Sequence, residues 1–248
     1  INLLAAPIGC GFYYLYTERI APQYPQATNE KVQLMESELK KSNARYVLDD
    51  LSVRYPKEKP DDTHRVLIIG SSQTWGSGAL RETDRFSNQL EMLLNAQNNG
   101  RLPAECLNTG MPSMNSRSLY PFFQEMAAYE PDVVIINLGH NDEYPTRFSG
   151  FLKRYVADTW ALDAEPIFSL EPVSREIWGP WLAAHSAMYK VMIDLDIPHV
   201  DTTIELNEYF DTGFIFWDSV HLTSYGHKLV AEILHDEVRH VLDNLRQR

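Results

Sequence analysis

Short apolar runs alternate with longer segments of helical periodicity through most of this 248-residue chain. The apolar runs cover residues 66–70, 104–108, 132–139, 166–171 and 198–202, and the intervening helical segments cover 84–99, 115–129, 147–161, 180–195 and 224–245. Nearly continuous apolar strands that alternate with helices are typical of a parallel sheet with both faces covered. The sequence therefore predicts an α/β domain, a three-layer α/β/α sandwich around a parallel sheet of about five strands.

Charge and cysteine content exclude several classes of function. The formal net charge is −12 and the isoelectric point is about 5.1, so the chain is a poor partner for nucleic acid. Its two cysteines, Cys10 and Cys106, are far apart in sequence and match neither a disulfide framework nor a metal-binding spacing. We therefore expect no nucleic-acid partner and no metal or other cofactor.

The first 27 residues form a distinct segment, which opens on "INLLAAPIGCGFYYLY" and carries no charge before Glu18. Three interpretations remain open: the remnant of a membrane anchor, a cleaved signal peptide, and a helix packed on the domain. The tyrosines that precede Glu18 suit a membrane interface, which favours the anchor. That interpretation predicts attachment to a membrane through residues 1–27 and an extracytoplasmic location in the cell envelope.

A helix and a linker are predicted between this segment and the compact domain. Residues 28–51 carry apolar positions at helical spacing among many charges, which predicts a partly exposed helix. Residues 54–64, "RYPKEKPDDTH", are rich in proline and charge, the composition of a linker. The predicted organisation is thus a segment at 1–27, a helix and linker at 28–64, and a catalytic domain at 65–248.

Four unusual loops follow the predicted strands or precede the last helix. They read "GSS" at 70–72, "NTG" at 108–110, "GHND" at 139–142 and "DSVH" at 218–221. In an open parallel sheet, binding sites lie beyond the carboxyl ends of the strands. We therefore expect these four loops to meet at one site.

The ordered set of loops resembles the SGNH hydrolases, also called GDSL-type esterases and lipases, over about residues 65–245. The resemblance implies that Ser72 is the nucleophile, with Ser71 in the place of the family's aspartate. It also implies a catalytic acid and base in Asp218 and His221. These residue types suit the chemistry, because a serine hydroxyl needs an adjacent base and the base needs a carboxylate to orient it.

The resemblance further implies an oxyanion hole, with donors from the backbone N–H groups of Ser72 and Gly110 and from the Asn141 side chain. Neutral, preorganised donors of this kind stabilise the charge of a tetrahedral intermediate. Trp75 and Trp217 flank the site motifs. Two interpretations stay open for them: walls of a substrate pocket for an acyl group or a sugar, or packing residues.

The predicted function is hydrolysis of carboxylic esters through an acyl-serine intermediate, on a small-molecule or polysaccharide substrate. Two alternatives remain: O-acyl transfer to an envelope polysaccharide, and a catalytically silent partner in a membrane complex. An ordinary α/β-hydrolase is disfavoured, since residues 70–74 read Gly-Ser-Ser-Gln-Thr and lack the Gly-x-Ser-x-Gly motif. The acyl group, the alcohol and the oligomeric state are left open.

Overall fold

The structure, a computed structural model, describes residues 54–96, 101–142, 144–174 and 180–245. The chain divides into two compact units, Ile1–Tyr46 and Val47–Arg248, and every described residue belongs to the second. The apolar segment at 1–27 and the helix predicted at 28–51 lie outside the described residues. Within the described ranges, no helix combines the length and the apolar character needed to cross a membrane.

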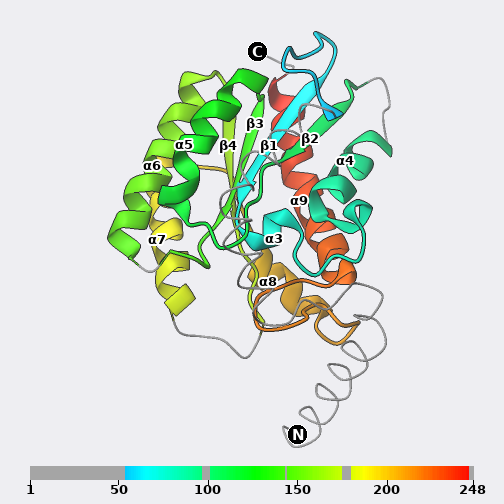
Figure 1. Ribbon diagram of the computed structural model, residues 1–248, viewed down its shortest axis with the longest axis vertical. Helices are drawn as coiled ribbons and strands as arrows, with labels where there is room; N and C mark the ends of the chain where they lie inside the picture. The colour runs from blue at the N-terminus through cyan, green and yellow to red at the C-terminus, as the bar shows by residue number, and fades with distance from the viewer. Residues whose placement is uncertain (1–53, 97–100, 143, 175–179, 246–248) are drawn as a thin grey trace, which may run out of the picture. The chain divides into compact units, whose positions relative to one another are not determined.

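Five parallel strands form one sheet in the order β2-β1-β3-β4-β5, which confirms the predicted architecture (Figure 1). The strands are β1 (His64–Gly70), β2 (Ala104–Asn108), β3 (Val133–Leu138), β4 (Glu165–Leu170) and β5 (His199–Asp201). Each lies within two residues of its predicted bounds, because buried strands in a two-sided parallel sheet leave a clear apolar signature.

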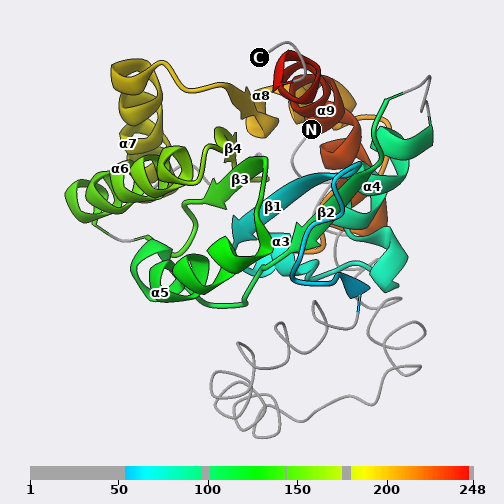
Figure 2. The ribbon, with the colours of Figure 1, turned by 90° about the horizontal axis from the view of Figure 1, so that it is seen from above.

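Helices cover both faces of the sheet, as Figure 2 shows from above. One face carries α4 (Phe86–Ala96) and α9 (Ser224–Leu245), and the other carries α5 (Ser116–Met126), α6 (Pro145–Ala161) and α7 (Pro180–Leu195). All five helices were predicted from their periodicity. The structure adds the short helices α3 (Ser72–Trp75) and α8 (Thr202–Leu206), together with 3₁₀ turns at Glu82–Asp84, Ala127–Tyr129 and Asn207–Tyr209.

The core lies on both faces of β1 and β3. Side chains along Val66–Ile69 and Val133–Ile136 are at most 1% exposed, so these strands are buried on their two sides. Residues of α4 and α9 pack against one face, with Leu90 and Leu234 fully buried there. Burial of apolar surface on this scale is the main force that fixes the sheet and, with it, the loops at its ends.

Residues 54–63, which the sequence marks as linker-like, pack against the domain. The Tyr55 side chain is only 6% exposed. The guanidinium group of Arg65, which is fully buried, donates to the backbone carbonyls of Pro56 at 2.6 Å and Lys57 at 2.8 Å. A buried guanidinium needs acceptors, and this segment supplies them.

The strand order places a topological switch between β1 and β3. From β1 the chain crosses to β2 on one side, and it then returns through α5 to β3 on the other side of β1. Loops at the carboxyl ends of β1 and β3 therefore diverge, and ligands of open α/β sheets bind at such points. Ser72 and Asn141 lie in these two loops.

Candidate active site

Gly70 ends β1 and lets the short helix α3 sit directly on the end of the sheet. A Cβ atom at this position would lie 1.8 Å from Oγ1 of Thr74 and 2.6 Å from the carbonyl oxygen of Asn137. Without that side chain, Thr74 approaches β3 and donates from Oγ1 to Oδ1 of Asn137 at 2.9 Å. The strand thus stops at a glycine because only a glycine permits this close approach, and Ser72 starts the helix that results.

The structure brings Ser72, His221 and Asp218 into one hydrogen-bonded chain. Nε2 of His221 lies 3.1 Å from Oγ of Ser72, and Nδ1 of His221 lies 2.7 Å from Oδ2 of Asp218. The other carboxylate oxygen of Asp218 accepts from the backbone N–H groups of Val220 at 2.8 Å and His221 at 2.7 Å. The turn from 218 to 221 therefore fixes both the carboxylate and the imidazole.

The same contacts keep Asp218 ionised. Partial burial raises the pKa of its carboxyl group, but the hydrogen bonds from the His221 side chain and from two backbone N–H groups outweigh that effect. The pKa of Asp218 consequently lies below its ordinary value. An ionised carboxylate at this position favours a hydrogen on Nδ1 of His221, which leaves Nε2 as the acceptor that faces Ser72.

Asn141 lies at the junction of two loops. Its side-chain Nδ2 donates to the backbone carbonyl of Met114 at 2.8 Å, in the loop between β2 and α5. The neighbouring carboxylate of Asp142 accepts from Oγ of Ser116 at 2.6 Å and from its backbone N–H at 3.1 Å. Both contacts hold the loop after β3 against the loop after β2. An amide nitrogen carries two hydrogens, so Asn141 has one more to donate.

Gly110 has a packing role, and its N–H group is already hydrogen-bonded. That N–H donates to Oδ1 of Asn108 at 2.9 Å. A Cβ atom at Gly110 would lie 2.1 Å from the backbone nitrogen of Trp75, so the glycine allows α3 to pack on this loop. Three residues later, Ser113 is exposed with φ at 62°, in the left-handed region that favours glycine. Among the described residues, none accepts a hydrogen bond from the N–H of Ser113.

Trp75 and Trp217 are both half-buried near the triad. The indole N–H of Trp217 donates to the carbonyl of Gly78 at 2.6 Å, and its ring meets Phe214 edge-on with centroids 5.5 Å apart. The guanidinium of Arg85 lies 5.1 Å from the centre of the Trp75 ring. These contacts hold both indoles in place, and their role in substrate binding stays a prediction.

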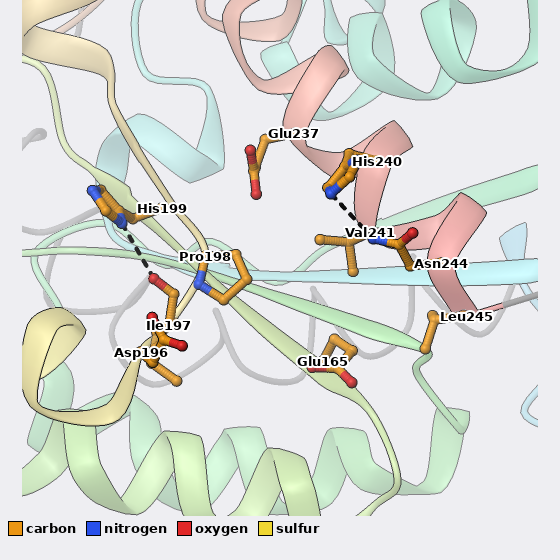
Figure 3. Close-up of a pocket in the computed structure, with 10 residues that line it drawn as sticks. All are labelled: Glu165, Asp196, Ile197, Pro198, His199, Glu237, His240, Val241, Asn244 and Leu245. Atoms are coloured by element: carbon orange, nitrogen blue, oxygen red, sulfur yellow. Dashed lines mark hydrogen bonds between the residues drawn. The ribbon is translucent and has the colours of Figure 1, made fainter. Parts of the chain in front are cut away.

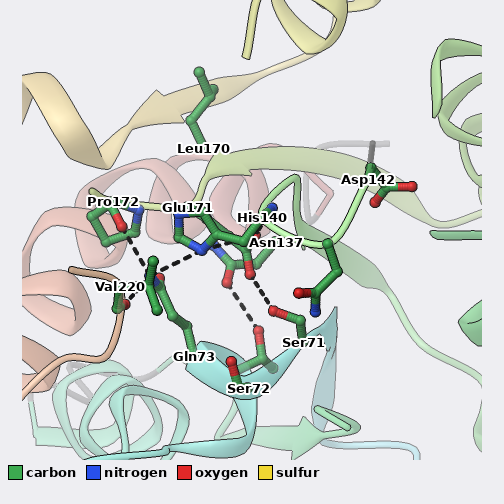
Figure 4. Close-up of polar contacts among 12 residues, drawn as sticks. Ser71, Ser72, Gln73, Asn137, His140, Asp142, Leu170, Glu171, Pro172 and Val220 are labelled. Carbon is green, nitrogen blue, oxygen red and sulfur yellow. Dashed lines mark hydrogen bonds and ion pairs between the residues drawn. The ribbon is translucent and has the colours of Figure 1, made fainter. Parts of the chain in front are cut away.

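Sequence reasoning missed a group of buried polar side chains next to Ser72, shown in Figure 4. Gln73 is 1% exposed and Glu171 is fully buried at the end of β4. Burial raises the pKa of Glu171 to about 7, although hydrogen bonds from His140 and Ser71 act in the opposite direction. Burial also lowers the pKa of His140 to about 3, so this imidazole is neutral. A carboxylate at the carboxyl end of a predicted strand is the signal that marks Glu171 in the sequence.

A cavity of about 480 Å³ lies away from these groups, between β5 and the last turns of α9 (Figure 3). Its lining includes Glu165 at the start of β4, Asp196 before β5, and Glu237 and His240 on α9. These positions lie at the amino ends of the strands, opposite the edge that carries the triad. The site residues predicted from the sequence therefore lie at the opposite end of the sheet from this cavity, at the end where ligands of open α/β sheets bind.

Comparison with known proteins places this fold and its motifs in a family. Residues 68–229 match the model of the GDSL-like lipase/acylhydrolase family. An α/β hydrolase from the metagenome of Lake Arreo, Spain, is 19% identical with a TM-score of 0.62, over 71% of this chain and 95% of that one. An acetylxylan esterase from Geobacillus stearothermophilus is 22% identical with a TM-score of 0.60, over 71% of this chain and 94% of that one. No curated protein sequence matches the chain.

Proposed function

Because the chain belongs to the GDSL-like lipase/acylhydrolase family and is an ester hydrolase of that family, we propose that it acts through an acyl intermediate on Ser72. The observation that carries this proposal is the hydrogen-bonded chain from Ser72 through His221 to Asp218, with distances of 3.1 and 2.7 Å. A nucleophile within reach of a base, and a base held by a carboxylate, is the arrangement that serine acyl transfer needs.

The proposed reaction has two halves. In the first, Nε2 of His221 takes the Ser72 proton while Oγ attacks the ester carbonyl, and the resulting imidazolium returns that proton to the leaving alcohol. In the second, water attacks the acyl-serine, His221 takes a proton from that water, and the carboxylic acid leaves as Ser72 regains its hydrogen. Asp218 stays ionised throughout and stabilises the imidazolium in both halves.

The oxyanion needs donors near Ser72, and three groups suit this role. We assign the backbone N–H groups of Ser72 and Gly110 and the second hydrogen of the Asn141 amide, as the resemblance to the family implies. The N–H of Gly110 donates to Oδ1 of Asn108 at 2.9 Å, so the oxyanion would replace that acceptor. Loss of a single donor of this kind typically costs about 2.7–4 kcal/mol of transition-state stabilisation.

For the substrate we propose esters with a short acyl group, including acetyl esters of carbohydrates. The support is the structural likeness to an acetylxylan esterase, at 22% identity. Transfer of the acyl group to a sugar hydroxyl uses the same intermediate, so the assay must separate it from hydrolysis. The location in the cell envelope, which rests on residues 1–27, likewise stays a proposal.

The test is hydrolysis of p-nitrophenyl esters of increasing acyl length, with acetylated xylan as a second substrate, by the wild type and by Ser72→Ala and Ser71→Ala. We expect the acetyl ester to be preferred, Ser72→Ala to lose nearly all activity, and Ser71→Ala to keep much of it. Added xylo-oligosaccharide acceptors that become acylated would indicate transfer. Equal activity in Ser72→Ala and the wild type would refute the proposed mechanism.

A further inference from the structure

Glu171 is a buried carboxyl group without a cationic partner. It follows the last residue of β4 and its side chain is fully buried. Within the described part of the chain, no lysine or arginine forms an ion pair with it, and the nearby His140 is neutral because burial depresses its pKa. Burial of a carboxylate is costly unless hydrogen bonds compensate. The hydrogen bonds of the Glu171 carboxyl group therefore indicate its function.

The carboxylate of Glu171 joins two loops of the active site. Its Oε1 accepts from Oγ of Ser71 at 2.6 Å, and its Oε2 accepts from the backbone N–H of His140 at 2.6 Å. The residue after Ser71 is the nucleophile Ser72, and the residue after His140 is Asn141. One carboxylate thus holds the residue that precedes the nucleophile and the residue that precedes the oxyanion amide.

Gln73 extends this buried layer to the catalytic histidine. Its Nε2 donates to the carbonyl of Pro172 at 2.8 Å and to the carbonyl of Val220, which precedes His221. Pro172 directly follows Glu171 in the chain. The loops that carry the nucleophile, the oxyanion amide and the base are therefore all fixed to the segment at the end of β4 (Figure 4).

We propose that Glu171 is a positioning residue, whose carboxylate sets the distance between Ser72 and Asn141 by binding Ser71 and the backbone of His140. The inference rests on the proposed function, since it assigns Glu171 to the same reaction. The rate of a catalysed reaction depends steeply on the positions of the reacting groups, and a misplacement of about 1 Å can lower it about 100-fold. A positioning role therefore predicts a loss in kcat, with little change in KM.

This role is distinguishable from a purely structural one. Glu171→Met removes the desolvation cost of a buried carboxyl group but leaves two buried donors, the Ser71 hydroxyl and the His140 N–H, without their acceptor. These effects on stability oppose one another, so kcat is measured per folded molecule, with the folded fraction determined by circular dichroism. A structural role predicts a loss of folded protein with normal kcat in the molecules that remain folded.

The experiment compares Glu171→Gln and Glu171→Met with Glu165→Gln, a control at the other end of β4, using p-nitrophenyl acetate. In the Gln variant, the amide oxygen accepts from the His140 N–H and the amide nitrogen donates to Ser71, so we expect kcat to fall about threefold to tenfold. In the Met variant we expect a fall of about 100-fold with KM within about twofold. Glu165→Gln should match the wild type.

Combination with Ser71→Ala tests the route through which Glu171 acts. We expect this change to lower kcat by no more than about threefold in the wild type but to add little to Glu171→Met, since interacting residues are not additive. A Met variant with kcat within about twofold of the wild type, or additive effects in the double variant, would overturn the inference. Parallel assay of Ser72→Ala keeps the two proposals apart: if it retains activity, the proposed function fails; if only the Glu171 variants behave normally, this inference alone fails.

Discussion

The two ends of the sheet differ in what they offer a ligand. At the carboxyl ends, the side chains that we propose as catalytic are held by hydrogen bonds: His221 by Asp218 at 2.7 Å and Asn141 by Met114 at 2.8 Å. At the amino ends, a cavity of about 480 Å³ is lined by titratable side chains such as Glu237 and His240, and among the described residues these form no hydrogen-bonded chain like that of Ser72, His221 and Asp218. The end to which we assign the reaction is the one where polar groups are fixed in relation to one another.

If the proposed function holds, fixed geometry identifies the site of this protein better than concavity does. Preorganised donors and acceptors lower a reaction barrier because they need no rearrangement when charge develops. Titratable side chains around a cavity supply charge without that preorganisation. The comparison predicts large effects on activity from substitutions at the carboxyl ends of the strands and very small ones from substitutions in the cavity.

The largest effect is expected from His221→Ala. The variant lacks the base that takes the Ser72 proton, so kcat for p-nitrophenyl acetate should fall by about 10⁵-fold or more, as in other serine triads. Steady-state kinetics measure the loss, and the melting temperature should stay close to that of the wild type because His221 is partly exposed. A residual rate within about tenfold of the wild type would show that another group is the base.

Asp218→Asn should have the second largest effect, a fall in kcat of about 10³-fold. The new amide places a donor opposite Nδ1 of His221, which moves the imidazole hydrogen to Nε2 and removes the acceptor that faces Ser72. In the wild type, Asp218 stays ionised at working pH because its pKa is lowered. In Glu171→Gln, which removes the other carboxyl group that titrates near the site, the acid limb of kcat/KM should therefore show the slope of a single proton. A slope of two in that variant, or an unimpaired Asn variant, would contradict this assignment.

Glu171 should make the stability of the protein depend on pH. Its pKa is about 7 in the folded state, because burial outweighs its hydrogen bonds, against 4.5 ordinarily. The folded state therefore binds a proton at Glu171 more tightly than the unfolded state does. The contribution of this proton to the free energy of unfolding is complete below pH 4.5 and is lost as pH rises to about 7. Over that window the wild type should lose about 3 kcal/mol relative to Glu171→Gln.

Urea unfolding of both proteins at several pH values measures this difference. His140, His185 and His221 also face Glu171, from three different parts of the chain. They are present in both proteins, and burial lowers the pKa values of His140 and His185. Parallel stability curves for the wild type and the Gln variant would mean that Glu171 ionises at its ordinary pH.

The smallest effect is expected in the cavity. His240→Ala and Glu237→Gln alter its lining without contact with the triad, so kcat/KM should stay within about twofold and stability within about 0.5 kcal/mol. The same ester assay and thermal unfolding measure both quantities. A loss of activity comparable to that of Asp218→Asn would mean that the amino ends of the strands take part in the reaction.

The sequence predicted the sheet, its five large helices and the loops that meet at the site. Buried strands such as Val133–Leu138 are nearly continuous apolar runs, and α9 repeats its apolar face over many turns. The motifs around Ser72 and His221 also have fixed spacing in the sequence. Local patterns of this kind are readable from the chain because they depend on neighbours in the sequence.

The supporting contacts were not predictable in the same way. Ser71 and Glu171 are 100 residues apart, and nothing in either neighbourhood indicates their hydrogen bond. The engagement of the Gly110 N–H by Asn108 depends on a side-chain rotamer, which the motif does not specify. Residues 54–63 have the composition of a linker. That composition does not reveal that their backbone carbonyl groups accept hydrogen bonds from the buried guanidinium of Arg65.

The most direct test of the central claim is identification of the residue that becomes covalently modified. The wild type is treated with a fluorophosphonate and digested, and the modified peptide is sequenced by mass spectrometry. We expect a single adduct on Ser72, its absence in Ser72→Ala, and a much slower reaction in His221→Ala, since Oγ is activated by the imidazole 3.1 Å away. An adduct on Ser71 or on any other residue, with Ser72 unmodified, would contradict the account.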